Sequence, residues 1–137
     1  RGAYILADSG GEPQVILIGT GSEVSLCVSA YEKLVAEGIK ARVVSMPSMT
    51  LFESYCEANP GYREEVLPSK VTARVSVEMG TTMGWHRYVG LAGKAIGMHS
   101  YGTSAPAAEA MKKFGFTVDA VVAAARALLH RFFALQA

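Results

Sequence analysis

Short apolar runs alternate with polar stretches along the chain, and their spacing predicts strands and helices in turn. Residues 4–6 and 15–18 favour strands and are separated by turn formers at 8–13, so we expect these two runs to pair as a hairpin. The second run is apolar at every position, which is typical of a strand that is covered on both faces. It stops at Gly19, and apolar residues then recur at helical spacing over 24–35.

Capping signals predict where the helices begin and end. Thr20, with Glu23 three residues later, forms a capping box ahead of the first helix, and Gly38 suits the left-handed position after its last turn. Thr50 and Glu53 form a second capping box, which predicts another helix start.

The remaining patterns alternate between strands and helices. Residues 41–46 form a short strand, and this completes a strand, helix, strand unit whose two strands are parallel. Asn59 is expected to cap a short helix over 60–67, with Pro60 at its first position. Apolar and polar residues alternate over 71–77, as in a parallel strand with one wetter face. The later predicted elements are a loop at 80–84, a short helix at 85–89, a weak strand at 95–98, a helix at 104–113, and a long helix at 118–132 that Thr117 caps.

This order of elements predicts one α/β domain that covers residues 1–137. We expect a three-layer α/β/α arrangement around a mostly parallel five-stranded sheet with one antiparallel edge strand. The chain starts at Arg1 without an initiator methionine, so we also expect it to be a fragment of a longer polypeptide.

The composition indicates that part of the surface is normally covered. Charged residues make up 18% of the chain and hydrophobic residues 50%, whereas soluble domains average about 25% charged residues. Met79, Met83 and Trp85 lie in a loop-rich stretch where the domain's own core is poorly placed to bury them. We therefore expect these three residues to form an interface with a companion domain or subunit.

Charge and hydropathy exclude several other partners. The net charge is +1 and no Lys/Arg cluster occurs, which argues against nucleic acid as a partner. No apolar run reaches the roughly 18 residues needed to cross a bilayer, and the N-terminus does not resemble a signal peptide. We expect no membrane contact and a cytoplasmic location, in which Cys27 and Cys56 are small apolar residues without a disulfide.

The glycine-rich segment at 19–24 lies between a strand and a helix, where a dinucleotide fingerprint places its phosphate loop. Val24 occupies the position of the third glycine, and the next strand ends at Ser45 and Met46 where an acidic ribose partner is needed. We therefore favour a tight turn with a capping box over a nucleotide site.

Open α/β sheets collect ligands at the carboxyl ends of their parallel strands. Any ligand pocket is accordingly expected at an edge formed by Thr20, Ser22, Ser45, Glu78 and Thr81. Glu23 and Glu78 place negative charge near this edge, so its preference for an anion should be weak.

Other candidate chemistry is incomplete. Glu78 and His86 could serve as a general acid and a general base, but no nucleophile motif or oxyanion loop accompanies them. We expect Glu78 to accept hydrogen bonds from the backbone of the loop that follows it. The three histidines lack metal-ligand spacing. The sequence therefore assigns no catalytic, cofactor-binding or metal-binding residue.

Several segments resemble the C-terminal domain of transketolase. They are, in order, 19–24 (Gly-Thr-Gly-Ser-Glu-Val), 41–48, 66–68, 71–78, 88–90, 104–107 and 114–118. Two related groups of thiamine-dependent enzymes, the 2-oxo acid dehydrogenase β subunits and deoxyxylulose-phosphate synthase, share this domain. They usually differ at Met46-Pro47-Ser48, so the resemblance to transketolase is stronger.

The resemblance implies a homodimeric enzyme of the pentose phosphate pathway that contains thiamine diphosphate and Mg or Ca. Such an enzyme transfers a two-carbon ketol unit from a ketose phosphate to an aldose phosphate. The cofactor motifs of the family lie in its two preceding domains and do not occur in this chain. An accessory domain that supports dimerisation or regulation, and that is inactive when isolated, is therefore implied. The alternatives are a nucleotide- or anion-binding domain and a protein-docking domain.

Overall fold

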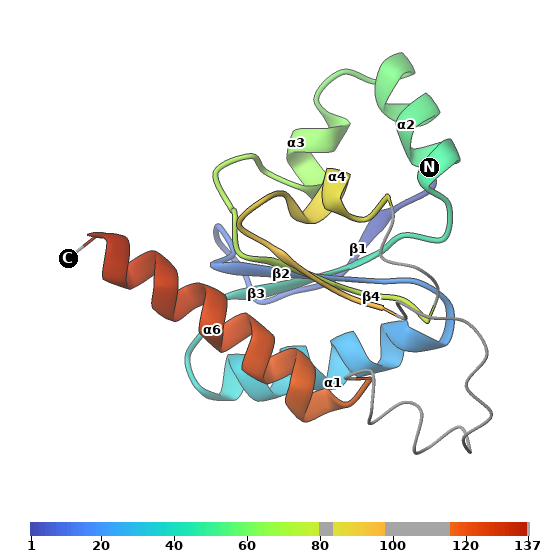
Figure 1. Ribbon diagram of the computed structural model, residues 1–137. Helices are drawn as coiled ribbons and strands as arrows, with labels where there is room; N and C mark the ends of the chain where they lie inside the picture. The colour runs from blue at the N-terminus through green and yellow to red at the C-terminus, as the bar shows by residue number, and fades with distance from the viewer. Residues whose placement is uncertain (80–83, 98–115, 137) are drawn as a thin grey trace.

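A five-stranded mixed sheet forms the middle of the molecule. The computed structural model describes residues 1–79, 84–97 and 116–136, and Figure 1 shows the sheet between two layers of helices. The strands are β1 (Tyr4–Asp8), β2 (Val15–Gly19), β3 (Ala41–Ser45), β4 (Arg74–Val77) and β5 (Lys94–Ile96), in the spatial order β1-β3-β2-β4-β5. Among these described strands, only β1 runs antiparallel to its neighbour. The predicted fold class is therefore confirmed.

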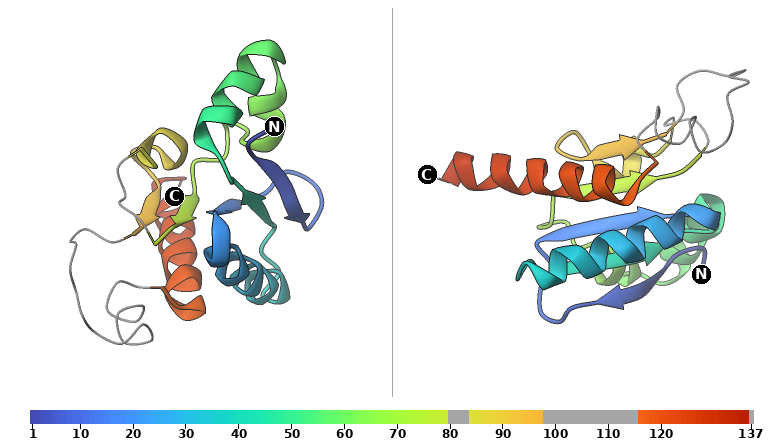
Figure 2. Two further views of the ribbon diagram at one scale, coloured as in Figure 1. Left: turned by 90° about the vertical axis from the view of Figure 1, so that its right-hand side faces the viewer. Right: turned by 90° about the horizontal axis from the view of Figure 1, so that it is seen from below.

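Helices cover both faces of the sheet. On one face α1 (Val24–Ala36) and α6 (Val118–Gln136) lie side by side, as the view from below in Figure 2 shows. The other face carries α2 (Met49–Ala58), α3 (Tyr62–Val66) and α4 (His86–Val89). Within the described residues, no helix is long and apolar enough to cross a membrane.

The apolar run of β2 explains this three-layer packing. Val15 and Leu17 belong to the core cluster under α1 and α6, whereas Ile16 and Ile18 belong to the cluster under α2, α3 and α4. Successive side chains of a strand point to opposite faces, so a strand with helices on both sides must be apolar throughout. The prediction of a strand covered on both faces is confirmed.

The predicted hairpin between the first two strands is wrong. β1 pairs with β3, and Tyr4 lies opposite Ser45. The crossover through α1 places β3 directly beside β2, and the Ser9 side chain bonds the backbone of Ala41 as the connection from β1 passes the start of β3. Alternate residues of β1 are exposed, and such a strand suits a sheet edge better than the centre.

The first predicted capping box does not form. Thr20 makes no side-chain capping bond, because a 3-10 turn, η1 (Gly21–Glu23), precedes α1. The backbone carbonyl of Thr20 accepts the N–H of Glu23, and the Glu23 carboxylate accepts a hydrogen bond from the Ser22 hydroxyl. The tight turn itself is present, as the sequence predicts.

The second predicted capping box is also wrong, because the N-cap of this helix lies two residues before Thr50. Ser48 is the N-cap of α2, and its hydroxyl accepts the N–H of Leu51 at 3.1 Å. Thr50 lies inside the first turn and is exposed. Glu53 turns away from the helix start and binds Arg63.

Asn59 ends α2 instead of starting the next helix. Its side-chain amide and its backbone N–H both donate to the Tyr55 carbonyl. The chain then turns at Gly61, whose φ of 99° favours glycine, and α3 begins at Tyr62. The expected helix is therefore shorter than predicted.

The later predictions have mixed outcomes. β4 is limited to Arg74–Val77, and Ser76 is buried because α4 packs over that face, so the predicted wetter face is wrong. Thr117 caps α6 as predicted, accepting the N–H of Ala120. The helix expected at 104–113 lies outside the described residues.

Candidate functional site

The carboxyl ends of three parallel strands lie side by side. Gly19 of β2 is in register with Ser45 of β3 on one side and with Val77 of β4 on the other. Thr20 and Glu78 directly follow β2 and β4, so the structure brings them to the same edge of the sheet as Ser45. This arrangement is the geometry that the sequence predicts for a ligand edge.

The residues of this predicted edge differ in how far solvent reaches them. Ser22 lies in η1 and is exposed, with its hydroxyl bonded to Glu23. Ser45 is almost fully buried. Thr81 lies outside the described residues. The part of the edge that solvent reaches is therefore formed mainly by Thr20, Ser22 and the half-buried Glu78.

Gly19 is needed for packing. A Cβ at this position would lie 3.0 Å from the Sγ atom of Cys27 and 3.0 Å from the Cα atom of Val24. The strand end and the first turn of α1 are thus in direct contact. This close approach explains the glycine without a phosphate ligand, in agreement with the tight-turn interpretation.

Negative charge is buried at the start of α1. The side chain of Glu23 is almost fully buried. Burial, together with a smaller effect of the charge of Glu23, raises the pKa of the Cys27 thiol to about 12. A thiol with this pKa stays protonated, so Cys27 is a core residue. The carboxylate also opposes the favourable field that a helix N-terminus offers to an anion.

Glu78 accepts a hydrogen bond from the indole N–H of Trp85. The sequence predicts backbone partners for Glu78 from the following loop, and residues 80–83 of that loop lie outside the described residues. The indole is a partner that the sequence did not indicate.

Trp85 does not lie on an exposed interface. Its side chain is only 2% exposed and packs against Tyr88, with ring centroids 6.1 Å apart. The expectation that the domain's own core leaves Trp85 uncovered is therefore wrong, because α4 turns the indole toward the sheet. Met79 is 39% exposed, and Met83 lies outside the described residues.

A polar cluster that sequence reasoning missed connects α2, α3 and α4. The Glu53 carboxylate accepts two hydrogen bonds of 2.6 Å from the Arg63 guanidinium and one of 3.0 Å from the Tyr88 hydroxyl. Arg87 approaches to 3.8 Å. The hydrogen bonds from Arg63 lower the pKa of Glu53. A cavity of about 390 Å³ adjoins this cluster and is also lined by Met49, Thr50 and Gly84.

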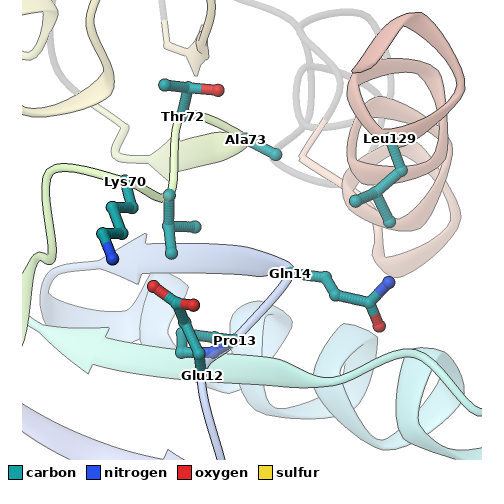
Figure 3. Close-up of a pocket in the computed structure, with 8 residues that line it drawn as sticks. Glu12, Pro13, Gln14, Lys70, Thr72, Ala73 and Leu129 are labelled. Atoms are coloured by element: carbon teal, nitrogen blue, oxygen red, sulfur yellow. The ribbon is translucent and has the colours of Figure 1, made fainter. Parts of the chain in front are cut away.

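A second cavity, of about 340 Å³, lies at the opposite, amino edge of the sheet. Figure 3 shows its walls, which come from the loop before β2, the segment before β4, and α6. The lining residues are Glu12, Pro13, Gln14, Lys70, Val71, Thr72, Ala73 and Leu129. No spacing in the sequence brings these segments together, which explains why sequence reasoning did not find the cavity.

The fold and its edges define a class of protein, a three-layer α/β domain with a mixed five-stranded sheet. Residues 2–117 match the family described as "Transketolase-like TK C-terminal domain", and the chain belongs to this family. The predicted resemblance to transketolase is thereby confirmed.

Individual relatives agree with the family match. Transketolase 1 of Escherichia coli (strain K12) is 57% identical over 129 residues, which cover 94% of this chain and 19% of the relative. Transketolase of Nostoc is 50% identical over 129 residues, which again cover 94% of this chain and 19% of the relative. The solved transketolase from Leishmania mexicana superposes with a TM-score of 0.82 at 43% identity, covering 96% of this chain and 18% of that one. The chain thus spans about a fifth of the length of the relatives that it matches.

Proposed function

We propose that this chain is the C-terminal domain of a transketolase, a transferase that moves a two-carbon ketol unit from a ketose phosphate to an aldose phosphate. The match to Escherichia coli transketolase 1, 57% identical over 94% of this chain, carries the proposal. The longer enzyme would be a homodimer with thiamine diphosphate and Mg or Ca, active in the cytoplasm in the pentose phosphate pathway.

Thiamine diphosphate and its metal do not fit the residues of this domain that the structure describes. Within residues 1–79, 84–97 and 116–136, no group of three or more His, Cys, Asp or Glu could hold a metal ion. A diphosphate at the start of α1 would meet the buried carboxylate of Glu23. We therefore assign the cofactor to the remaining domains and derive no catalytic step here.

The role that we propose for this domain is accessory. It supports the dimer or its regulation, and the isolated chain does not catalyse ketol transfer. A solved relative, described as "Split gene transketolase, inactive beta4 tetramer", gives support from outside this chain. It superposes with a TM-score of 0.66 at 26% identity, and this chain covers 42% of it.

The interface that we propose uses exposed apolar side chains. Met79 is exposed, and Leu91, in the turn after α4, is fully exposed. Together with Met83 they would contact the remaining transketolase domains or the second subunit. Trp85, which is buried, is excluded from this surface.

A weak ligand site at the carboxyl edge is the second candidate function. The ends of β2, β3 and β4 bring Thr20, Ser45 and Glu78 together, with Ser22 and Thr81 as further candidates. Soaking crystals with sulfate or a sugar phosphate tests this site. Density at another place, with none at this edge, would contradict it.

Calorimetric titration of thiamine diphosphate with Mg²⁺ tests the accessory role. We expect no saturable binding to the isolated chain and no ketol transfer by it. Circular dichroism must first show that the isolated chain is folded, and the full-length enzyme serves as the positive control. Saturable binding by the folded isolated chain would overturn the assignment of the cofactor to the other domains.

A further inference from the structure

The first residue of the chain is held over two aromatic rings. The guanidinium carbon of Arg1 lies 5.8 Å from the ring centroid of Tyr55 and 5.6 Å from that of Tyr62. Both distances are within the range of about 6 Å that is typical of cation–π contacts. The two rings are packed edge to face, with centroids 4.8 Å apart, so α2 and α3 present them to Arg1 as one surface.

The next two residues are held by hydrogen bonds of their backbone. The carbonyl of Gly2 accepts the N–H of Ser48 at 3.1 Å. The carbonyl of Ala3 accepts the Tyr62 hydroxyl at 2.6 Å, and Ala3 itself is fully buried. These contacts join the start of the chain to the first turn of α2 and to α3 before β1 begins.

Gly2 shows how closely the backbone approaches α2. Its φ is +84°, and a Cβ at this position would lie 2.1 Å from the backbone nitrogen of Phe52 and 2.6 Å from the carbonyl oxygen of Ser48. Contacts under 3.0 Å with backbone atoms cannot be relieved by rotating a side chain. Only glycine therefore allows the chain to lie at this position.

An exposed apolar side chain lies beside this contact. Leu51, the neighbour of Phe52 on α2, is 60% exposed. Figure 1 places the N-terminus next to α2, so any polypeptide that precedes Arg1 leaves the domain at this point.

We propose that Arg1, Gly2 and Ala3 form an N-terminal clamp, which holds the polypeptide preceding Arg1 on α2 so that it covers Leu51. The inference rests on the proposed function, because it concerns the junction between this domain and the rest of a longer transketolase. Covalent continuity favours this occupant, because the residues that precede Arg1 are joined to it and must pass close to α2. A second copy of the chain is not held near α2 in this way. The junction is then a fixed connection, because a hinge requires residues whose backbone angles are free to change.

Trypsin tests the clamp in the longer enzyme, because Arg1 provides a cleavage site within it. We expect the bond between Arg1 and Gly2 to be resistant in the wild type. Gly2→Ala should accelerate its cleavage about tenfold, since proteolysis of a folded protein follows the population of locally open forms. Gly38→Ala is the matched control, because Gly38 has the same φ of +84° and a Cβ there meets nothing within 4 Å.

A second pair of variants covers the case in which Gly2→Ala prevents folding. Tyr62→Phe removes only the hydroxyl that binds Ala3 and should also accelerate cleavage after Arg1. Tyr31→Phe, on α1, is its control and should leave the rate unchanged. Equal rates for variants and controls, or rapid cleavage after Arg1 in the wild type, would overturn the clamp.

Two further measurements identify the occupant and separate the two proposals. Leu51→Glu should accelerate cleavage after Arg1 if the preceding residues cover Leu51. A change in oligomeric state without faster cleavage would instead assign Leu51 to a second copy and contradict the proposal. An enzyme without ketol transfer activity would refute the proposed function, whereas an active enzyme with an unprotected Arg1 would refute only the clamp.

Discussion

The indole N–H of Trp85 donates a hydrogen bond to the carboxylate of Glu78, and this bond joins the start of α4 to the end of β4. The sequence places Glu78 at a ligand edge and Trp85 at an interface. In the structure the two side chains bind each other, so both contribute to holding α4 on the sheet.

Trp85→Gln is therefore expected to destabilise the fold. A nearly fully buried indole is replaced by a smaller polar group, and truncation of buried aromatic residues typically lowers the free energy of unfolding by about 3 kcal/mol or more. Urea unfolding measures the change. Val35→Gln, at an exposed position on α1, is the control and should stay within about 0.5 kcal/mol of the wild type. Wild-type stability in the Trp85 variant would show that the indole is not part of the core.

The N-cap of α2 can be tested with two neighbouring residues. Ser48→Ala removes the hydroxyl that accepts the N–H of Leu51 and should lower the free energy of unfolding by about 1 kcal/mol. Thr50→Ala, at the position that the sequence predicts as the cap, should have little effect. The reverse ranking in thermal or urea unfolding would support the capping box that the sequence predicts.

Glu53 should make stability depend on pH in the acid range. Hydrogen bonds from Arg63 lower its pKa in the folded chain below the ordinary value of 4.5. The resulting stabilisation is present above pH 4.5 and is lost as the pH falls through the lowered pKa. It amounts to at most about 1 kcal/mol, because the pair is partly exposed and screened by solvent.

The measurement compares urea unfolding of the wild type and Glu53→Gln between pH 3 and 7. The difference between them should be largest near neutral pH and should shrink below about pH 4.5. Glu57→Gln, at an exposed position of the same helix, is the control. A difference that grows on acidification would contradict the assignment of the ion pair.

The two cysteines should differ in reactivity. Burial raises the pKa of Cys27 to about 12, whereas Cys56 lies half-buried on α2. Because the thiolate is the reactive form, a thiol reagent at pH 8 should modify Cys56 in the native chain and Cys27 only on unfolding. Mass spectrometry of the labelled chain, with Cys56→Ser as the control, checks this order. Rapid native labelling of Cys27 would show that the start of α1 opens easily.

The sequence by itself determined the order and type of most elements, because hydrophobic spacing is a local property. The apolar run at 15–18 and the helical spacing over 24–35 were sufficient to predict β2, α1 and a parallel crossover. A mostly parallel sheet with one antiparallel edge strand followed from that order, and so did the meeting of Thr20, Ser45 and Glu78 at one edge.

The tertiary structure decided how these elements meet. β1 pairs with β3 because the crossover through α1 fills the place beside β2, a contact between segments over 30 residues apart. Capping boxes at Thr20 and Thr50 match a short pattern, but packing of the strand ends sets where each helix begins. Two single residues could not be interpreted from local sequence for the same reason. Trp85 is buried by segments that are distant in sequence, and Gly2 must be glycine because α2 lies against it. Local spacing predicts elements, whereas close packing between distant segments determines which side chains remain available for function.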